Sequence, residues 1–482
     1  MLFNSIQFAI FLPIIFILYW FVVGRNFKWQ NILLLVASYY FYACWDWRFL
    51  FLLIFSTLLD YFTGLRMSTS SNQELKKFWL WLSIIINLGF LGIFKYYNFF
   101  IESFAAALKN YNLEVNPWTF KIILPVGISF YTFHGLSYVI DVYKDRLKAE
   151  KNFIDYAVFV SFFPLLVAGP IERATHLLPQ IQRVRVFNDS KMVDGLRQIL
   201  WGLFKKIVIA DQCAFYANQI FDSSSSFNGS TLLIGAIFFS FQIYCDFSGY
   251  SDIALGTARL FGIELLRNFA YPYFSRDIAE FWRRWHISLS SWFRDYVYIP
   301  LGGSKGGTWY SLRNILIIFV ISGFWHGANW TFIFWGLLNG IYFIPLLLLR
   351  KNRNHLDIVA KNRVWPTTNE LTSIIFTFTI TIFAWIFFRA ENMSHAFAYI
   401  SNIFSSNFFE IPLYEKRFYS ILLTGLIGFM IFFEWNGRMN LHALEDIELK
   451  FSYLKRRGLY YFLILLIFIF RGAEQEFIYF QF

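Results

Sequence analysis

Long runs of apolar residues that contain no Asp, Glu, Lys or Arg dominate the pattern of this chain. A helix needs about 20 apolar residues to cross the roughly 30 Å hydrocarbon core of a bilayer. The clear candidates are residues 1–24, 29–45, 78–94, 122–140, 156–171, 223–245, 314–349 and 371–388, and weaker ones are 49–65 (interrupted by Asp60), 418–433 and 458–470. The pattern predicts an all-α polytopic membrane protein with about ten or eleven membrane segments, some tilted, short or re-entrant.

The organisation of the chain points to one membrane-embedded domain that covers residues 1–482. We expect the run at residues 1–24 to remain as a membrane helix, because no Lys or Arg precedes it and no small-residue cleavage site follows it. Basic residues alternate between the early loops in a way that favours an N-terminus outside the cell. There is no internal repeat and no linker typical of soluble domains.

Residues 275–307 differ from the apolar runs, because they are rich in Arg and Trp and contain no run able to span. The apolar residues that recur at helical spacing are Ile278, Trp282, Trp285, Leu289, Trp292 and Tyr296. This periodicity predicts an amphipathic helix that lies along an interface or packs into a polar cavity, with His286 on its apolar face. The following GGSKG (302–306) is interpreted as a flexible turn, since it lacks the strand-to-helix context of a serine nucleophile.

Composition supports a membrane protein: 57% of the residues are hydrophobic and 15% are charged, against about a quarter charged in soluble globular proteins. The net charge of +11 is spread over the loops, which argues against a nucleic-acid partner. Cys44, Cys213 and Cys245 lie far apart in apolar sequence, and we expect them to be packing residues.

His326 is the first candidate for chemistry, because it lies within SGFWHGANW, inside the charge-free run at residues 314–349. As one helix this run would be about 54 Å long, so it must tilt strongly, extend beyond the membrane or break. Gly323 and Gly327 bracket His326 and favour a local break that forms a cavity wall. An imidazole at membrane depth suits general acid or base catalysis; the alternative is a neutral histidine hydrogen-bonded to a neighbouring helix.

Two other histidines, His134 and His286, fall in apolar surroundings. The spacing of His286 and His326 gives little support for a metal site, and no metal is predicted. Asp246 and Asp252 end a span in YCDFSGYSDIALG, where structural roles rank ahead of cation binding.

The chain ends in the aromatic segment EFIYFQF, residues 476–482. Such a segment is commonly an interfacial anchor, but it could also insert into a groove of a partner and present the hydroxyl of Tyr479. A free phenol has a pKa near 10, so Tyr479 would need a nearby base to accept an acyl group.

Five motifs together closely resemble the membrane-bound O-acyltransferase family, and within it the membrane subunits of bacterial alginate O-acetyltransferases. They are PVGISFYTFHGLSYVIDVYK (125–144), FPLLVAGPIER (163–173), DFSGYSDIALG (246–256), EFWRRWHISLSSWFRDYVYIPLGG (280–303) and SGFWHGANWTFIFWG (322–336). The resemblance implies a many-helix bundle with a central funnel or tunnel, in which an acyl group moves from a thioester donor to a hydroxyl.

The resemblance also assigns site residues and partners. It implies that His326, in the WHG motif, is catalytic and that His286, in the RRWH motif, lines the tunnel; no role is transferred to His134. The expected mechanism has His326 as general base, while His286 or a nearby backbone or Asn donor polarises the carbonyl. The donor would be acetyl-CoA, with no tightly bound cofactor, and Tyr479 would relay the acyl group to an extracytoplasmic esterase-like partner. The acceptor would be a polysaccharide outside the bacterial cytoplasmic (inner) membrane.

Three alternatives remain open. Two lie within the family, namely D-alanyl transfer to teichoic acid and O-acetylation of peptidoglycan. The third belongs to another class, a proton-coupled transporter or channel in which His286 and His326 form a proton relay or gate.

Overall fold

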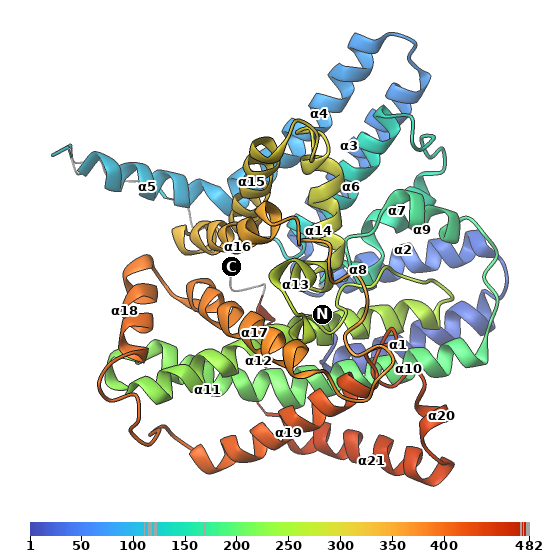
Figure 1. Cartoon of the computed structure of the whole chain (residues 1–482). Helices are drawn as coiled ribbons and strands as arrows, with labels where there is room; N and C mark the ends of the chain where they lie inside the picture. Colours follow the sequence, from blue (N-terminus) through green and yellow to red (C-terminus); the bar gives the residue numbers. More distant parts are fainter. Residues whose placement is uncertain are drawn as a thin grey trace. The chain divides into compact units, whose positions relative to one another are not determined.

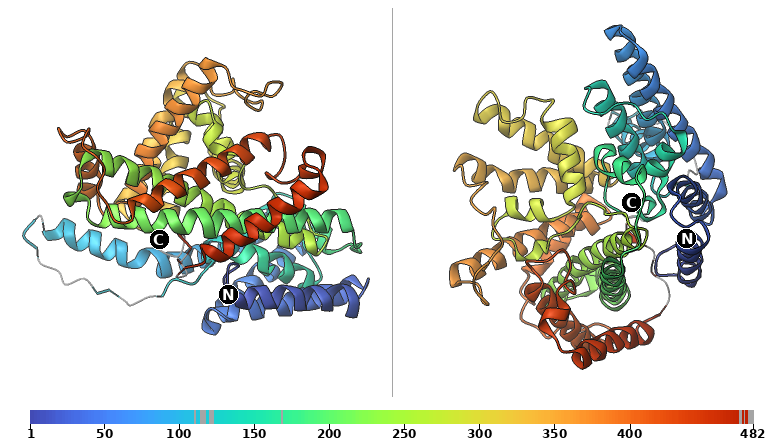
Figure 2. Two further views of the ribbon diagram at one scale, coloured as in Figure 1. Left: turned by 90° about the horizontal axis from the view of Figure 1, so that it is seen from below. Right: turned by 90° about the vertical axis from the view of Figure 1, so that its right-hand side faces the viewer.

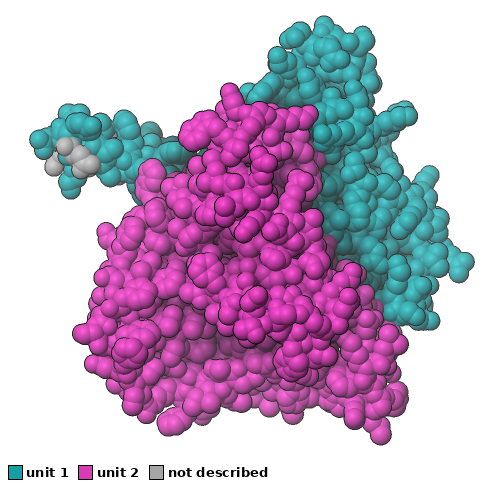
Figure 3. Space-filling view, viewed as in Figure 1, with its two compact units in different colours: residues 1–192, 257–266 teal, residues 193–256, 267–482 magenta. Residues whose placement is uncertain are grey.

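The structure is a computed structural model that describes residues 1–109, 111–113, 118–119, 123–167, 169–472, 475 and 477–478. Every regular element within these ranges is a helix, so the predicted all-α class is confirmed. The chain divides into two compact units, which Figure 3 shows in two colours. Unit 1 comprises residues 1–192 and 257–266, and unit 2 comprises residues 193–256 and 267–482.

The helices follow one another along the chain as labelled in Figure 1. Those of unit 1 are α1 (Ile6–Ile17), α2 (Phe27–Ala43), α3 (Trp47–Thr69), α4 (Gln73–Leu91), α5 (Tyr97–Lys109), α6 (Ile128–Tyr143), α7 (Phe153–Ser161), α8 (Phe163–Leu166) and α9 (Ala174–Ile181). Those with residues of both units are α10 (Asp189–Leu203) and α12 (Gly229–Leu260). Those of unit 2 are α11 (Asp211–Asp222), α13 (Ile278–Arg284), α14 (Ile287–Phe293), α15 (Thr308–His326), α16 (Trp330–Leu348), α17 (Thr368–Arg389), α18 (Met393–Ile403), α19 (Arg417–Asn436), α20 (Ile447–Lys450) and α21 (Tyr453–Ile469).

Within the described residues, seven helical segments are long and apolar enough to cross a membrane. They are α3, the continuous segment Gln73–Lys109 that contains α4 and α5, α12, α15, α16, α17 and α19. A shorter apolar helix covers Ile6–Val22. These segments make the chain a multi-pass membrane protein.

Two of the apolar runs do not form single long helices. The run at 156–171 is divided, because α7 ends at Ser161 and the short α8 follows with Pro164 in its first turn. In the run at 122–140, α6 begins at Ile128; it has 16 residues and is buried along almost all of its length. The helices of both runs pack against other helices of unit 1, and periodicity alone does not distinguish such packing from contact with lipid.

In unit 1, buried polar groups on apolar helices are paired with each other. Asp60 of α3 accepts hydrogen bonds from Ser83 Oγ at 2.6 Å and from Asn87 Nδ2 at 2.8 Å, both on α4. The charge that interrupts the apolar run at 49–65 is therefore satisfied inside the unit. Helices α1 and α2 lie side by side (Figures 1 and 2), with the ring of Phe11 6.0 Å from that of Phe41.

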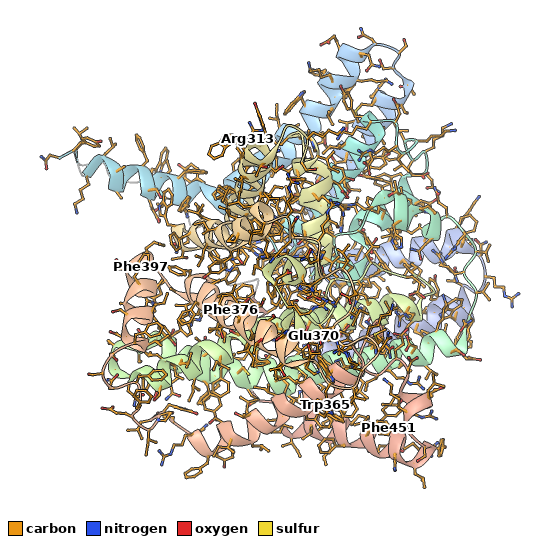
Figure 4. All side chains as sticks on the ribbon, in the orientation of Figure 1. Arg313, Trp365, Glu370, Phe376, Phe397 and Phe451 are labelled. Carbon is orange, nitrogen blue, oxygen red and sulfur yellow. The ribbon has the colours of Figure 1, made fainter. Side chains whose placement is uncertain are left out.

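In unit 2, side-chain caps and aromatic contacts fix the ends and the packing of the helices. A capping box begins α17: Glu370 N–H donates to Thr367 Oγ1 at 3.2 Å, and Thr367 N–H donates to Glu370 Oε2 at 2.8 Å. Figure 4 labels Glu370 in the first turn of this helix. The rings of Phe429 on α19 and Phe462 next to it on α21 lie 5.7 Å apart.

The run at 314–349 breaks, which is one of the three predicted outcomes. Helix α15 ends at His326, Gly327 is extended, and Asn329 caps α16 by accepting a hydrogen bond from Thr331 N–H at 3.1 Å. The two helices then pack backbone to backbone. A Cβ added to Gly336 would lie 2.2 Å from the carbonyl oxygen of Phe319, a distance that only glycine avoids.

Replacing Gly336 with Val is expected to force α15 and α16 apart and to lower the midpoint of thermal unfolding in detergent by several degrees, because overpacking costs about 1–3 kcal/mol. Gly425→Ala is the matched control. Gly425 lies in α19, and a Cβ added there would meet no neighbouring side chain or helix within 4 Å. An unchanged midpoint for Gly336→Val would contradict the close packing of these helices.

Candidate active site

The imidazole of His326 lies at the end of α15, enclosed by aromatic rings of unit 2. Its side chain is buried, with 2% of the residue exposed. Its ring centroid is 5.1 Å from that of Trp335 on α16 and 5.4 Å from that of Phe388 on α17, both in edge-on geometry. The break after α15 thus places an ionisable ring among buried aromatic rings, and an ionisable residue at membrane depth is a candidate functional residue.

His286 lies at a break between two short helices, and this corrects the prediction of one amphipathic helix through residue 286. Helix α13 ends at Arg284, α14 begins at Ile287, and His286 has a left-handed backbone with φ of 42°. The residue is 1% exposed. A left-handed non-glycine residue is strained and is found where the surroundings hold it in place, often at functional sites.

The two histidines lie against the same indole ring. The ring of Trp325, which precedes His326 in the chain, lies 4.9 Å from the His326 ring and 6.0 Å from the His286 ring. The structure therefore places both predicted site histidines, which are 40 positions apart in the sequence, beside one side chain. The linking role of Trp325 was not predicted, although the residue belongs to the WHG motif.

The arginines of the RRWH motif are bonded to other groups of unit 2 and hold α13 in place. Glu280 is buried and accepts from Arg276 Nε at 3.0 Å and from Arg284 Nη2 at 2.7 Å. Arg283 donates to the carbonyl oxygens of Asn352 and His355, each at 2.8 Å. These bonds position the end of α13, and with it the backbone that enters His286.

The described part of the C-terminal segment is buried in unit 2. Phe477 and Ile478 are 0% and 1% exposed. The Phe477 ring lies 4.5 Å from the ring of Tyr250 and 6.0 Å from that of Phe247. The Phe247 ring is in turn 4.6 Å from the His286 ring. The segment thus reaches the aromatic cluster around His286, whereas Tyr479 itself lies outside the described residues.

Asp246 holds this segment through its main chain. Ile478 N–H donates to Asp246 Oδ2 at 2.8 Å, and Lys206 Nζ lies 2.7 Å from Asp246 Oδ1 and 2.7 Å from Asp211 Oδ1. Lys206 also donates to the carbonyl oxygen of Gln475 at 3.3 Å. Asp246 therefore has the structural role ranked first from the sequence, in a buried ion-pair network that also holds the main chain at Gln475 and Ile478.

The remaining candidates lie in structural positions. Asp252 pairs with Lys205 at 2.7 Å. His134, in unit 1, accepts a hydrogen bond from Glu172 N–H at Nε2, at 3.1 Å. The free thiols Cys213 and Cys245 are buried and Cys44 is exposed. Across the part of the chain that the structure describes, no three His, Cys, Asp or Glu side chains gather in a way that could hold a metal ion.

Comparison with known proteins decides the family. The sequence profile of the membrane-bound O-acyltransferase family, MBOAT, matches residues 142–389. The chain is also 40% identical over 407 residues to the Azotobacter vinelandii protein named "Probable alginate O-acetylase AlgI", covering 84% of this chain and 78% of the relative. The chain belongs to the membrane-bound O-acyltransferase family.

Two further relatives have names that specify other polymers. The chain is 36% identical to the peptidoglycan O-acetyltransferase of Helicobacter pylori, over 84% of this chain and 80% of the relative. It is 31% identical to the teichoic acid D-alanyltransferase of Streptococcus thermophilus, over 50% of this chain and 62% of the relative. Family membership makes the protein an O-acyltransferase, and the matched region contains both His286 and His326.

Proposed function

We propose that this acyltransferase moves an acetyl group from cytoplasmic acetyl-CoA toward hydroxyls of an extracytoplasmic polysaccharide, in the bacterial cytoplasmic membrane. The observation that carries the proposal is the pair of buried imidazoles, His286 and His326, that share contact with Trp325 inside the family-matched region. The 40% identity to a protein named for alginate O-acetylation favours acetyl as the acyl group and a polysaccharide as the acceptor.

The proposed step is a transesterification at a dry site. His326 takes the proton of the acceptor hydroxyl, whose oxygen forms a bond to the thioester carbonyl carbon. The carbon–sulfur bond then breaks, and the thiolate of coenzyme A receives the proton from His326. The aromatic enclosure by Trp335 and Phe388 excludes water that would otherwise hydrolyse the thioester.

The proposed first acceptor is the phenol of Tyr479. Its neighbours in sequence, Phe477 and Ile478, are buried beside Tyr250 and Asp246, which supports a chain end that enters the protein. Acetyl-Tyr479 would be a phenyl ester, a more reactive donor than an alkyl ester. A partner with an esterase-like nucleophile outside the membrane would take the acetyl group from it and pass it to the polymer.

The relatives supply the alternatives within the family. Peptidoglycan O-acetylation uses the same acetyl group on another acceptor, and teichoic acid D-alanylation uses another acyl group. A transporter or channel is disfavoured because the chain belongs to an acyltransferase family over residues 142–389.

Purified protein in proteoliposomes with acetyl-labelled acetyl-CoA is expected to consume the thioester and release free coenzyme A when an acceptor is present. D-alanyl carrier protein and a proton-flux measurement in the same vesicles are the comparison arms. Proton flux without thioester consumption would overturn the proposed enzyme function in favour of a transporter. Consumption of only the D-alanyl donor would overturn acetyl transfer in favour of D-alanyl transfer.

A further inference from the structure

The side chain of Asn268 lies against His286 and makes four hydrogen bonds within unit 2. His286 Nδ1 is 3.0 Å from Asn268 Oδ1, and the same oxygen accepts from Ser288 Oγ at 2.9 Å and from Ser288 N–H at 3.4 Å. On its other side, Asn268 Nδ2 donates to Ser251 Oγ at 3.1 Å. Asn268 is 1% exposed, so water does not compete for these bonds.

The backbone of the same residue holds the histidine loop. Ile287 N–H donates to the Asn268 carbonyl oxygen at 2.9 Å, and Ala270 N–H donates to the Arg284 carbonyl oxygen at 2.9 Å. These two bonds flank the left-handed backbone of His286. Asn268 therefore bonds to the segment around His286 through both its main chain and its side chain.

The orientation of the Asn268 amide is fixed by a group that can only donate. If the amide were turned over, Nδ2 would face the Ser288 N–H, and two donors would oppose each other. The oxygen therefore faces His286. Since this oxygen only accepts, the contact at 3.0 Å requires that His286 Nδ1 carry the proton.

The other ring nitrogen of His286 is then a lone-pair acceptor. Among the residues that the structure describes, Nε2 has no hydrogen-bond partner. The described aromatic rings next to it are those of Phe247, Phe269 and Trp325, which carry no charge. Burial alone lowers the pKa of His286 to about 3, so the ring is neutral at physiological pH.

We propose that Asn268 is a positioning residue that holds His286 in the Nδ1–H form, so that Nε2 serves the transfer reaction as a hydrogen-bond acceptor. The proposal rests on the proposed function for its catalytic consequence, whereas the hydrogen-bond geometry stands by itself. A neutral His286 in this form cannot donate from Nε2 to a carbonyl oxygen. Its task is to accept a hydrogen bond from the acceptor hydroxyl and so to orient it, while His326 takes the proton. Polarisation of the thioester carbonyl falls to another donor.

The direct test is the protonation pattern of the ring. Solid-state NMR of protein labelled with ¹³C and ¹⁵N at histidine distinguishes the nitrogens, because Nε2 correlates with Cδ2 and Nδ1 with Cγ. Subtracting the spectrum of His286→Gln assigns the signals. We expect an unprotonated nitrogen that correlates with Cδ2. A protonated nitrogen at that position would overturn the proposal whatever the activity of the protein.

The kinetic test uses two replacements of Asn268. Asn268→Leu removes the acceptor, and kcat is expected to fall about 100-fold with little change in KM for acetyl-CoA. Asn268→Asp keeps the acceptor but adds a negative charge that raises the pKa of His286. Because the unprotonated ring is the active form, the acid limb of the pH–rate profile should move to higher pH, with stronger activity than in Asn268→Leu.

Asn314→Leu is the matched control, because Asn314 is equally buried in unit 2 and donates to the carbonyl oxygens of Leu301 and Gly303, with no histidine involved. An equal loss of kcat in both Leu variants would assign Asn268 to folding alone and overturn the proposal. If the wild-type protein does not react with acetyl-CoA but its His286 shows the Nδ1–H form, the proposed function is rejected and the positioning of His286 by Asn268 still holds.

Discussion

Replacing His326 with Ala is expected to lower the rate of acetyl transfer by about 10²–10⁴-fold, the contribution of a well-placed general base. The reason is local: among the residues that the structure describes, the His326 ring packs against the rings of Trp325, Trp335 and Phe388. None of these rings can take a proton from a hydroxyl. The measurement is release of free coenzyme A from labelled acetyl-CoA by the purified variant, at saturating acceptor.

A loss of activity must be separated from a loss of packing. Ala leaves a void among three aromatic rings, so His326→Gln, which keeps most of the volume and a polar end, is measured alongside it. His395→Ala is the matched control: its ring contacts Ser224 Oγ at 3.1 Å and packs on Phe221, within unit 2. Undiminished transfer by well-folded His326→Ala and His326→Gln would remove the general-base assignment.

The fold class could be predicted because membrane helices obey a length rule that a sequence shows directly. The break after His326 was among the expected outcomes because the charge-free run was too long for one bilayer crossing. The break at His286 was not expected, since the apolar stripe continues unchanged through residues 278–296. It arises from a bond distant in sequence: Ile287 N–H donates to the carbonyl oxygen of Asn268 instead of continuing the helix.

Some residues of the candidate site could be predicted from the sequence and others could not. His326 and His286 could be predicted because an imidazole in apolar surroundings is costly and rare. Trp325 and Asn268 gave no such signal, because an indole in a membrane helix and an asparagine in a loop are ordinary in isolation. Their roles depend on partners 39 and 18 positions away in sequence, respectively. Only the folded chain shows that both touch His286.

The position of Phe477 and Ile478 changes the interpretation of the aromatic segment at 476–482. From the sequence, the segment at 476–482 was expected to be an interfacial anchor or an insert for a partner's groove. Instead, Phe477 and Ile478 are buried in unit 2, and the main chain is bonded to Asp246 and Lys206. An anchor needs only apolar side chains at a surface, whereas specific main-chain bonds to buried charges fix the segment in register. Such fixing is what a covalent relay at the next residue would require.

Replacing Tyr479 with Phe is therefore expected to abolish acetylation of the polymer, because the phenol oxygen is the only atom removed and the proposed relay forms its ester there. The wild-type protein, incubated with acetyl-CoA in the absence of a partner, should carry one acetyl group on its C-terminal peptide by mass spectrometry, and the variant should carry none. Tyr461→Phe, at an exposed tyrosine of α21, is the matched control and should leave both readouts unchanged. Polymer acetylation at the wild-type level in Tyr479→Phe would show that the acetyl group passes to its acceptor without this residue, while His326 could still act as the base.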